Sequence, residues 1–544
     1  MSGKHSERER KSKFTDQIEM INLDGPEKTG AKRSGHTRSA GRQTAGRKPQ
    51  GTQDRRRQPR EEGRAQTAGS AKRKTSGTSG RNLEFLIITY VFLAIFLGMI
   101  AWLVYFQIFR SESVISDSHN PRLNIYEERV IRGDILSGDG VVLATSKLNE
   151  DGSQTREYPY GRMFAHAVGY VNNGKGGIES SSNFQLLRSH SFFLTQLVND
   201  LTDQKSQGDS VVTTLNYEVQ EAAYEALGND DGAVVVLEAD TGKILAMVSK
   251  PDYDPNTLAD DWETIVNDDS SSVLLNRASS GLYPPGSTFK IFTALEYIHE
   301  NPDYDSYRFD CEGELSVDGS EIHCYHNSVH GQQNLMESFA NSCNTSFANI
   351  GLSLDVGKFA DFLDSALFNR ELPGDVSGAA SRFSLTEEDG TAKRMQTAIG
   401  QGDTLVSPLH MAMAAAAVAN DGTAMEPYLV DHTENDNGKT VRRYRPSEYG
   451  NLFSKEDAAI MQEFMGAVVS EGTASALSGQ SYQAAGKTGS AEYDSEGNSH
   501  GWFVGYASKE GYQDIAIAVI VEDGDSGSKS AVPVAKAVFD TYFN

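Results

Sequence analysis

The strongest hydrophobic feature of the chain is a run of 25 residues without a charge, from Phe85 to Phe109. An apolar run longer than about 18 residues is typical of a membrane-spanning helix. The core of a signal peptide would be shorter and nearer the start, and no small-residue cleavage site follows this run. We therefore predict one uncleaved transmembrane helix over residues 82–109.

Beyond this run, two regions differ in pattern. Residues 110–205 are polar and carry only brief strand-like pieces, such as "GVVLAT" and "HAVGYV", which predict a small module next to the membrane. From residue 206 the elements are longer and better patterned. The segment "GAVVVLEADTGKILAMVS", residues 232–249, predicts two strands joined by a hairpin turn at Asp240-Thr241-Gly242.

Further strands are predicted near the end of the chain, in "HGWFVGYAS" and "DIAIAVIVED", followed by a closing helix in "VPVAKAVFDTYF". Helices lie between the sheet segments. One begins at Ser454, which forms a capping-box pattern with Asp457, and another covers "SPLHMAMAAAAVAND", whose alanines allow close packing. This order predicts an α+β fold, in which helices face a mainly antiparallel sheet.

Charge is distributed unevenly along the chain. Residues 1–81 hold 21 Lys+Arg against 9 Asp+Glu, a net charge of +12, so the other 463 residues carry −37 of the total of −25. Because positive flanks stay in the cytoplasm, we expect the tail inside and everything after Arg110 outside. The tail has too few apolar residues to fold and is expected to be disordered. Topology and anionic lipids explain its arginines, so nucleic-acid binding is not expected.

The three cysteines, Cys311, Cys324 and Cys343, all fall in the predicted exterior part, where disulfides persist. Cys311 and Cys324 bracket "CEGELSVDGSEIHC", a segment with a Gly/Asp turn, and we predict that a disulfide closes it as a hairpin. Cys343 is then unpaired. No Cys/His cluster has the spacing of a zinc site and no glycine-rich phosphate loop follows a strand, so neither a metal nor a cofactor is expected.

Candidate chemistry begins in "YPPGSTFKIF", Tyr283 to Phe292. Two prolines and a glycine predict a helix start near Ser287, and the i, i+3 spacing brings Lys290 towards the Ser287 hydroxyl. The helix dipole and partial burial both disfavour the charged form of the lysine, which makes its amine available as a base. By itself, however, the pair is better explained as a serine cap followed by a solvated lysine.

Two later motifs change this interpretation. "SCN" offers the Ser342 hydroxyl and the Asn344 amide on one short stretch, and "GKTGSAEY", residues 486–493, offers a lysine, a threonine and a serine around Gly489. Ser-x-x-Lys, Ser-x-Asn and Lys-Thr-Gly in this order are the signature of active-site serine enzymes of the penicillin-binding and β-lactamase kind.

With these motifs, the chain after the predicted membrane helix resembles a class B, monofunctional penicillin-binding protein. "ERVIRGDILSGDGVVLAT" resembles the start of the class B pedestal; "REYPYGRMFAHAVGY", "LLNRASSGLYPPGSTFK", "HGQQNLMESFANSCNTSFA", "AIGQGDTLVSPLHMA" and "GKTGSAE" resemble further blocks. The resemblance implies a pedestal over residues 110–205 and, over residues 206–544, the serine β-lactamase and penicillin-binding transpeptidase fold. It also implies D,D-transpeptidation of peptidoglycan stem peptides and acylation by β-lactams.

The same resemblance implies a role for each motif residue. Ser287 would be the nucleophile and Lys290 the acceptor of its proton, although whether Lys290 or a relay is the formal base stays open. Ser342 and Lys487 would pass that proton to the departing D-alanine. Asn344 would orient the lysine and the substrate amide.

For substrate binding, the resemblance implies that the backbone N–H groups of Ser287 and Ser490 form the oxyanion hole. Thr488, Ser490 and Lys487 would receive the terminal carboxylate of the substrate. Gly489 suits a strand that a substrate must approach closely.

Other residues of interest have structural interpretations. His330, before a glycine, is expected to be a turn histidine. Cys343 is expected to be a small buried filler. Trp502 and Phe503 are expected to be strand core, with a place on the flank of the substrate groove as the alternative.

Several alternatives remain open from the sequence. A D,D-carboxypeptidase, a β-lactam sensor or a β-lactamase would share Ser287 and differ in whether water takes the acyl group, but no "ExxxN"-type element supplies a deacylating glutamate between the second and third motifs. A bifunctional class A enzyme would need a glycosyltransferase domain, for which residues 110–206 are too short. An inert scaffold of the cell-wall machinery is disfavoured by the complete motif set, although the resemblance to the family implies that the pedestal and membrane helix bind a membrane glycosyltransferase. The sequence does not distinguish elongation, division and sporulation.

Overall fold

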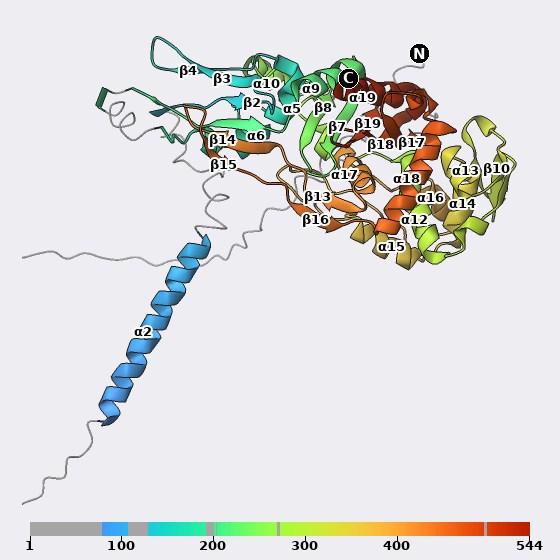
Figure 1. Ribbon diagram of the computed structural model, residues 1–544, viewed down its shortest axis with the longest axis horizontal. Helices are drawn as coiled ribbons and strands as arrows, with labels where there is room; N and C mark the ends of the chain where they lie inside the picture. Colours follow the sequence, from blue (N-terminus) through green and yellow to red (C-terminus); the bar gives the residue numbers. More distant parts are fainter. Residues whose placement is uncertain (1–78, 107–128, 192–200, 203, 269–271, 494–497) are drawn as a thin grey trace, which may run out of the picture. The chain divides into compact units, whose positions relative to one another are not determined.

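The computed structural model describes residues 79–106, 129–191, 201–202, 204–268, 272–493 and 498–544 (Figure 1). The chain divides into two units, residues 1–111 and 112–544, which are described separately. Nearly all of the basic tail that was predicted to be disordered lies outside the described residues.

In the first unit, helix α2 extends over Ser79–Tyr105. Its stretch Phe85–Tyr105 has 21 residues and no charge, and its side chains are exposed along their length. At 1.5 Å per residue this stretch is about 32 Å long, close to the hydrocarbon thickness of a bilayer. The helix is therefore long and apolar enough to anchor the chain in a membrane.

The second unit is built on a five-stranded antiparallel sheet in the order β17-β18-β19-β7-β8. Its strands are β17 Gln483–Glu492, β18 Ser499–Ser508, β19 Ile515–Val521, β7 Gly232–Glu238 and β8 Ile244–Lys250. Every residue of β7, β8 and β19 is buried, as expected for strands covered on both faces. The predicted hairpin and the two predicted C-terminal strands are confirmed.

Helices cover this sheet on both sides. Helix α9 (Tyr217–Leu227) and the closing helix α19 (Val532–Phe543) pack together above it in Figure 1, and α17 (Pro408–Ala419) lies below. The alanine-rich helix α17 packs on β19, β7 and β18, as predicted. Helix α18 (Lys455–Ser470) begins with the predicted capping box of Ser454 and Asp457.

The helix predicted after the two prolines is present, with a tighter start. A 3-10 turn, η3 (Gly286–Phe289), precedes α12 (Lys290–Glu300). Phe289, Phe292 and Leu295 are fully buried, as their spacing predicts. Further helices of this part of the described chain are α10 Leu258–Val266, α11 Arg277–Ser280, α13 Leu335–Ala340, α14 Asn344–Ser353, α15 Val356–Ser365 and α16 Thr391–Ala398.

A second, six-stranded sheet joins distant parts of the chain in the order β15-β14-β6-β2-β3-β4. Its strands are β15 Thr440–Arg443, β14 Val430–Glu434, β6 Ser210–Thr213, β2 Ile135–Leu136, β3 Val142–Leu148 and β4 Gln154–Glu157. Strand β2 pairs in parallel with β6, and the short β1 (Val130–Ile131) pairs in parallel with β5 (Ser206–Gln207). Strands from both sides of residues 205/206 thus share one sheet.

One sequence prediction in this region is wrong. The piece "HAVGYV" does not form a strand, because the 3-10 turn η2 (Gly161–Phe164) continues into helix α5 (Ala165–Val168). Gly169, at φ +89°, ends that helix in a conformation that other residues rarely adopt. A short apolar run does not distinguish a strand from a buried helical turn, which explains the error. The helices α6 (Gly177–Ser181) and α7 (Asn183–Leu186) follow.

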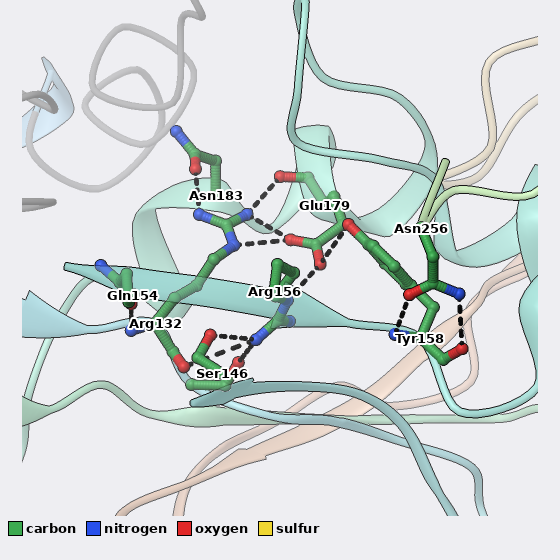
Figure 2. Close-up of polar contacts among 9 residues, drawn as sticks. Arg132, Ser146, Gln154, Arg156, Tyr158, Glu179, Asn183 and Asn256 are labelled. Atoms are coloured by element: carbon green, nitrogen blue, oxygen red, sulfur yellow. Dashed lines mark hydrogen bonds and ion pairs between the residues drawn. The ribbon is translucent and has the colours of Figure 1, made fainter. Parts of the chain in front are cut away.

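A buried ion-pair network holds this N-terminal part together (Figure 2). The carboxylate of Glu179, fully buried, accepts from Arg132 Nε at 2.6 Å and from Arg156 Nε at 2.7 Å. Burial alone would raise the pKa of Glu179, but the two guanidinium groups hold that pKa below its usual value. Tyr158 extends the network, since its backbone N–H and C=O both bond the Asn256 side chain. The network therefore ties the residue after β1, strand β4 and helix α6 to the segment after β8.

Candidate active site

The turn that carries Ser287 is fixed by its contacts with the edge of the main sheet. Gly286 has φ +52°, and a Cβ at this position would lie 2.8 Å from the Ser490 carbonyl oxygen. The Trp502 indole N–H donates to the Pro284 carbonyl at 3.0 Å. Only glycine suits both the backbone conformation and the space at position 286. The turn η3 therefore lies directly against strand β17.

Ser287 lies in this turn and Lys290, three residues later, begins helix α12, but the two side chains are not hydrogen-bonded. Ser287 is partly exposed, and among the described residues its hydroxyl has no hydrogen-bond partner. Lys290 is fully buried and donates to the Ser342 carbonyl at 2.8 Å and to Asn344 Oδ1 at 2.8 Å. Its Nζ also lies 3.4 Å from Ser342 Oγ. The structure thus joins the first motif to the second through the lysine.

Ser342 and Asn344 stand at the turn between α13 and α14. Ser342 has φ +55°, an uncommon conformation for a residue other than glycine. Cys343 caps α14, because its sulfur accepts from the Ser346 N–H at 3.5 Å. Asn344 accepts from Lys290 through Oδ1 and donates through Nδ2 to the His323 carbonyl at 3.0 Å. These two bonds fix the orientation of the Asn344 amide.

Lys487, in the middle of strand β17, reaches the same point from the sheet. Its Nζ donates to Ser342 Oγ at 2.9 Å and to the Thr488 carbonyl at 2.9 Å. The aromatic ring of Phe339 lies 5.6 Å from this nitrogen, and that of Phe347 lies 5.3 Å from Lys290 Nζ. The two amines therefore meet at Ser342 in surroundings that are largely apolar.

These surroundings change the protonation of both lysines. Burial lowers the pKa of Lys290 from its usual range to about 7. Burial also lowers the pKa of Lys487, which is reduced further by the nearby charge of Lys290, to well below its usual value. A buried amine without a carboxylate partner is easier to deprotonate, so the site offers neutral amines near neutral pH.

The residues around Lys487 lie along the edge of the sheet. Thr488 is nearly buried, and its hydroxyl bonds that of Thr473 at 2.5 Å, whereas Ser490 is partly exposed. Gly489 faces the nucleophile turn, since a Cβ there would lie 3.0 Å from the Pro285 carbonyl oxygen. Strand β17 is the outer strand of its sheet, so alternate backbone groups point away from β18.

Sequence reasoning missed two residues that support this site. Thr473 precedes β17 and holds Thr488, but no motif marks it. Trp502 and Phe503 are fully buried, as predicted, yet the indole of Trp502 also anchors the turn before Ser287. A buried indole N–H needs a hydrogen-bond acceptor, and this requirement is the signal from which the contact could have been predicted.

The predicted disulfide between Cys311 and Cys324 is not formed. Their sulfurs lie 3.6 Å apart, compared with about 2.0 Å in a disulfide. All three cysteines are free and buried, and Cys343 is the buried residue that was expected. The two sulfurs nevertheless come together with that of Cys343, which was expected to be unpaired.

Comparison with known families identifies the chain. A model described as the penicillin binding protein transpeptidase domain matches residues 232–540, more than half of the sequence. A second model, described as the penicillin binding protein A dimerisation domain, matches residues 132–211. The chain belongs to the class B penicillin-binding proteins. It is an enzyme of the D,D-transpeptidase type, as the order of its motifs predicted.

Individual relatives of this penicillin-binding protein cover most of its length. The peptidoglycan D,D-transpeptidase PbpA of Mycolicibacterium smegmatis is 32% identical over 475 residues, which cover 79% of this chain and 93% of the relative. A D,D-transpeptidase domain from Eggerthella lenta has a TM-score of 0.68 at 32% identity and covers 76% of this chain and 98% of its own. Penicillin-binding protein A from M. tuberculosis, solved as a ceftriaxone acyl-enzyme, has a TM-score of 0.70 at 28% identity and covers 78% of this chain and 100% of its own.

Proposed function

We propose that this penicillin-binding protein crosslinks peptidoglycan stem peptides through an acyl-enzyme on Ser287. The observation that carries the proposal is the meeting of the three motifs, in which Lys290 and Lys487 both lie within hydrogen-bond distance of Ser342 Oγ. Related structures solved as β-lactam acyl-enzymes support a covalent intermediate.

In the acylation step, the neutral amine of Lys290 takes the proton of Ser287. The serine oxygen then bonds to the carbonyl carbon of the penultimate D-alanine of the donor peptide. The terminal peptide bond breaks, and its nitrogen leaves as D-alanine after receiving a proton through Ser342 and Lys487. In the second step the amine of an acceptor stem peptide attacks the ester carbonyl, the bond to Ser287 breaks as the crosslink forms, and the proton that the amine loses returns to the Ser287 oxygen through Lys290.

Two further groups would act on the substrate. The backbone N–H groups of Ser287 and Ser490 would stabilise the oxyanion, and losing one such donor typically costs about 10²–10³ in rate. Thr488, Ser490 and Lys487 would hold the terminal carboxylate of the donor. The close approach of η3 to β17 supports this assignment, because it brings Gly286 within reach of the Ser490 backbone.

We also propose the arrangement of the chain at the membrane. Residues 1–81 would form a cytoplasmic tail and residues 82–109 the membrane anchor, with the pedestal (110–205) and the transpeptidase domain (206–544) outside. The basic charge before the apolar helix supports this orientation. The pedestal and the anchor are the surfaces that a membrane glycosyltransferase would bind, because the polymer that this enzyme crosslinks must be made beside it.

Labelling with a fluorescent penicillin tests the nucleophile. The full chain in detergent and the control variant Ser280→Ala are expected to retain the label through denaturing electrophoresis, whereas Ser287→Ala is expected to take up none. Label on Ser287→Ala would refute the assignment. Rapid loss of label from the native chain would instead indicate a β-lactamase.

A separate assay distinguishes crosslinking from hydrolysis. The full chain is given a donor peptide ending in D-Ala–D-Ala, with and without an acceptor amine. We expect a crosslinked product that requires both the acceptor and Ser287. Release of D-alanine alone at the same rate in both mixtures would make the chain a carboxypeptidase.

A further inference from the structure

The three cysteines and His330 converge behind the active site. The Sγ atoms of Cys311 and Cys324 lie 3.6 Å apart, and those of Cys324 and Cys343 lie 3.7 Å apart. The Nδ1 atom of His330 lies 3.3 Å from Cys311 Sγ. One ligand atom from each of these four residues lies within 4.8 Å of all the others.

These separations match the edges of a tetrahedral zinc site. With Zn–S bonds of about 2.3 Å and a Zn–N bond of about 2.0 Å, sulfurs lie about 3.8 Å from each other and about 3.5 Å from the nitrogen. Three thiolates and one imidazole are a common ligand set of structural zinc. We propose that Cys311, Cys324, Cys343 and His330 bind one zinc ion.

The surroundings of the sulfurs suit thiolates. The Thr345 hydroxyl lies 3.2 Å from Cys311 Sγ, 3.3 Å from Cys343 Sγ and 3.5 Å from Cys324 Sγ. The Ser346 N–H also points at Cys343 Sγ. Donors of this kind orient metal ligands and stabilise their charge. On binding, the three thiols release their protons to solvent and His330 supplies the lone pair of Nδ1, so the site carries a single net negative charge.

The part of the chain that supplies three of the ligands is built of short strands. Residues 309–333, here called the hairpin segment, form β9 Phe309–Cys311, β10 Glu314–Val317, β11 Ser320–His323 and β12 Gly331–Gln333. These strands make two separate two-stranded sheets, which are marginally stable without further support. The apolar cluster at this place consists of the three cysteines with Phe309 against them. Leu315, Val317 and Ile322 also pack on the main core, and a metal would add to the stability of these small sheets.

The zinc would also fix catalytic geometry. Cys343 stands between Ser342 and Asn344, and the carbonyl that accepts from Asn344 belongs to His323, next to Cys324. Binding would therefore clamp the turn that holds Ser342 in its left-handed conformation and would set the amide that faces Lys290. This consequence rests on the proposed function, whereas the metal site does not.

Metal analysis of the purified full chain tests the site. The chain in detergent is equilibrated with zinc under reducing conditions, freed of unbound ion and analysed for metal. We expect about one zinc per chain, with zinc K-edge X-ray absorption giving three sulfur neighbours and one nitrogen neighbour at about 2.3 and 2.0 Å. In His330→Gln the Kd for zinc should rise more than about 100-fold. The matched control His323→Gln, whose side chain is half exposed and outside the cluster, should bind as the native chain does.

Three outcomes would overturn the proposal. Absence of zinc together with three titratable thiols would overturn the proposal and leave three packed thiols. Absence of zinc with a single titratable thiol in denaturant without reductant would overturn it in favour of a disulfide. Bound zinc without sulfur neighbours would overturn it as well. The X-ray absorption measurement uses the native chain, so it does not depend on whether a variant folds.

Penicillin labelling separates the metal site from its catalytic consequence. Removal of zinc by a chelator is expected to slow labelling of Ser287, and restored zinc to recover it. If the chain binds one zinc but the chelator does not change the labelling rate, the metal site stands and its proposed effect on the active site is refuted. Failure of the Ser287→Ala test would leave the metal measurements unaffected.

Discussion

Lys487 donates a hydrogen bond of 2.9 Å to the Oγ of Ser342, which lies 145 residues earlier in the chain. The Nζ of Lys290, which belongs to the Ser-x-x-Lys motif, lies 3.4 Å from the same oxygen. A hydroxyl both accepts and donates, so Ser342 is the group through which a proton can pass between two buried amines.

Replacing Ser342 by alanine tests this connection. Ser342→Ala should slow acylation by a fluorescent penicillin by about 10²–10⁴-fold, the usual contribution of a positioned proton-transfer group. Stopped-flow or gel-based labelling rates measure the effect. Ser353→Ala, at the end of helix α14, where the Ser353 hydroxyl donates to the Ile350 carbonyl, is the control and should label normally. A change smaller than threefold at Ser342 would argue against the relay.

The rate of acylation should depend on pH through Lys290. Burial lowers its pKa to about 7, so the amine is charged below this pH and neutral above it. Only the neutral amine accepts the proton of Ser287, so the labelling rate should rise about tenfold per pH unit below pH 7 and level off above it. Lys290→Arg, which stays charged at any accessible pH, should label poorly throughout. A pH-independent rate in the native chain would assign the base to another group.

Gly489→Ala tests the close contact between β17 and the turn that carries Ser287. The added Cβ would lie 3.0 Å from the Pro285 carbonyl oxygen, 3.1 Å from Thr288 Cγ2 and 3.2 Å from Trp502 Cβ, so β17 and the nucleophile turn would have to separate by a few tenths of an ångström. We expect a fall in labelling rate of more than tenfold, because such misplacements cost up to about 10²-fold. Gly466→Ala, in α18 with no heavy atom within 4 Å of its Cβ, should label normally. Equal rates in both variants would show that the turn adapts.

Arg132→Met should destabilise the N-terminal part of the second unit. It removes one partner of Glu179 and leaves a buried carboxylate with less compensation, which typically costs about 3–5 kcal/mol. Thermal unfolding of the full chain measures the change. Lys147→Met breaks an exposed ion pair with Glu157 and should shift stability by less than about 1 kcal/mol. Similar shifts in the two variants would contradict the importance assigned to the buried network.

Local signals made the main sheet predictable, and the order of the motifs pointed to the candidate catalytic residues. Glycine and aspartate turns mark the β7–β8 hairpin, and the two prolines mark the start of η3, because these signals depend on neighbouring residues. The convergence of Lys290, Ser342 and Lys487 followed from a known motif order rather than from spacing, since 52 and 145 residues separate the bonded pairs.

Contacts without a local signal were not predictable in this way. Thr473 meets Thr488 only because α18 ends beside β17. The cysteine cluster was interpreted as one hairpin disulfide, because Cys343 and His330 join it through the fold and not through spacing. The piece "HAVGYV" failed for a different reason, since four apolar residues suit a buried helical turn as well as a strand.

The six-stranded sheet limits how this protein can be divided. Strand β6 lies between β14, from more than 200 residues later, and β2, from the N-terminal side of residue 206. A fragment that begins at residue 206 would keep β14 and lose β2, leaving one edge of β6 open to pairing with other molecules. The catalytic part is therefore not an autonomous piece, and a water-soluble form suited to crystallography should start between the apolar helix and β1.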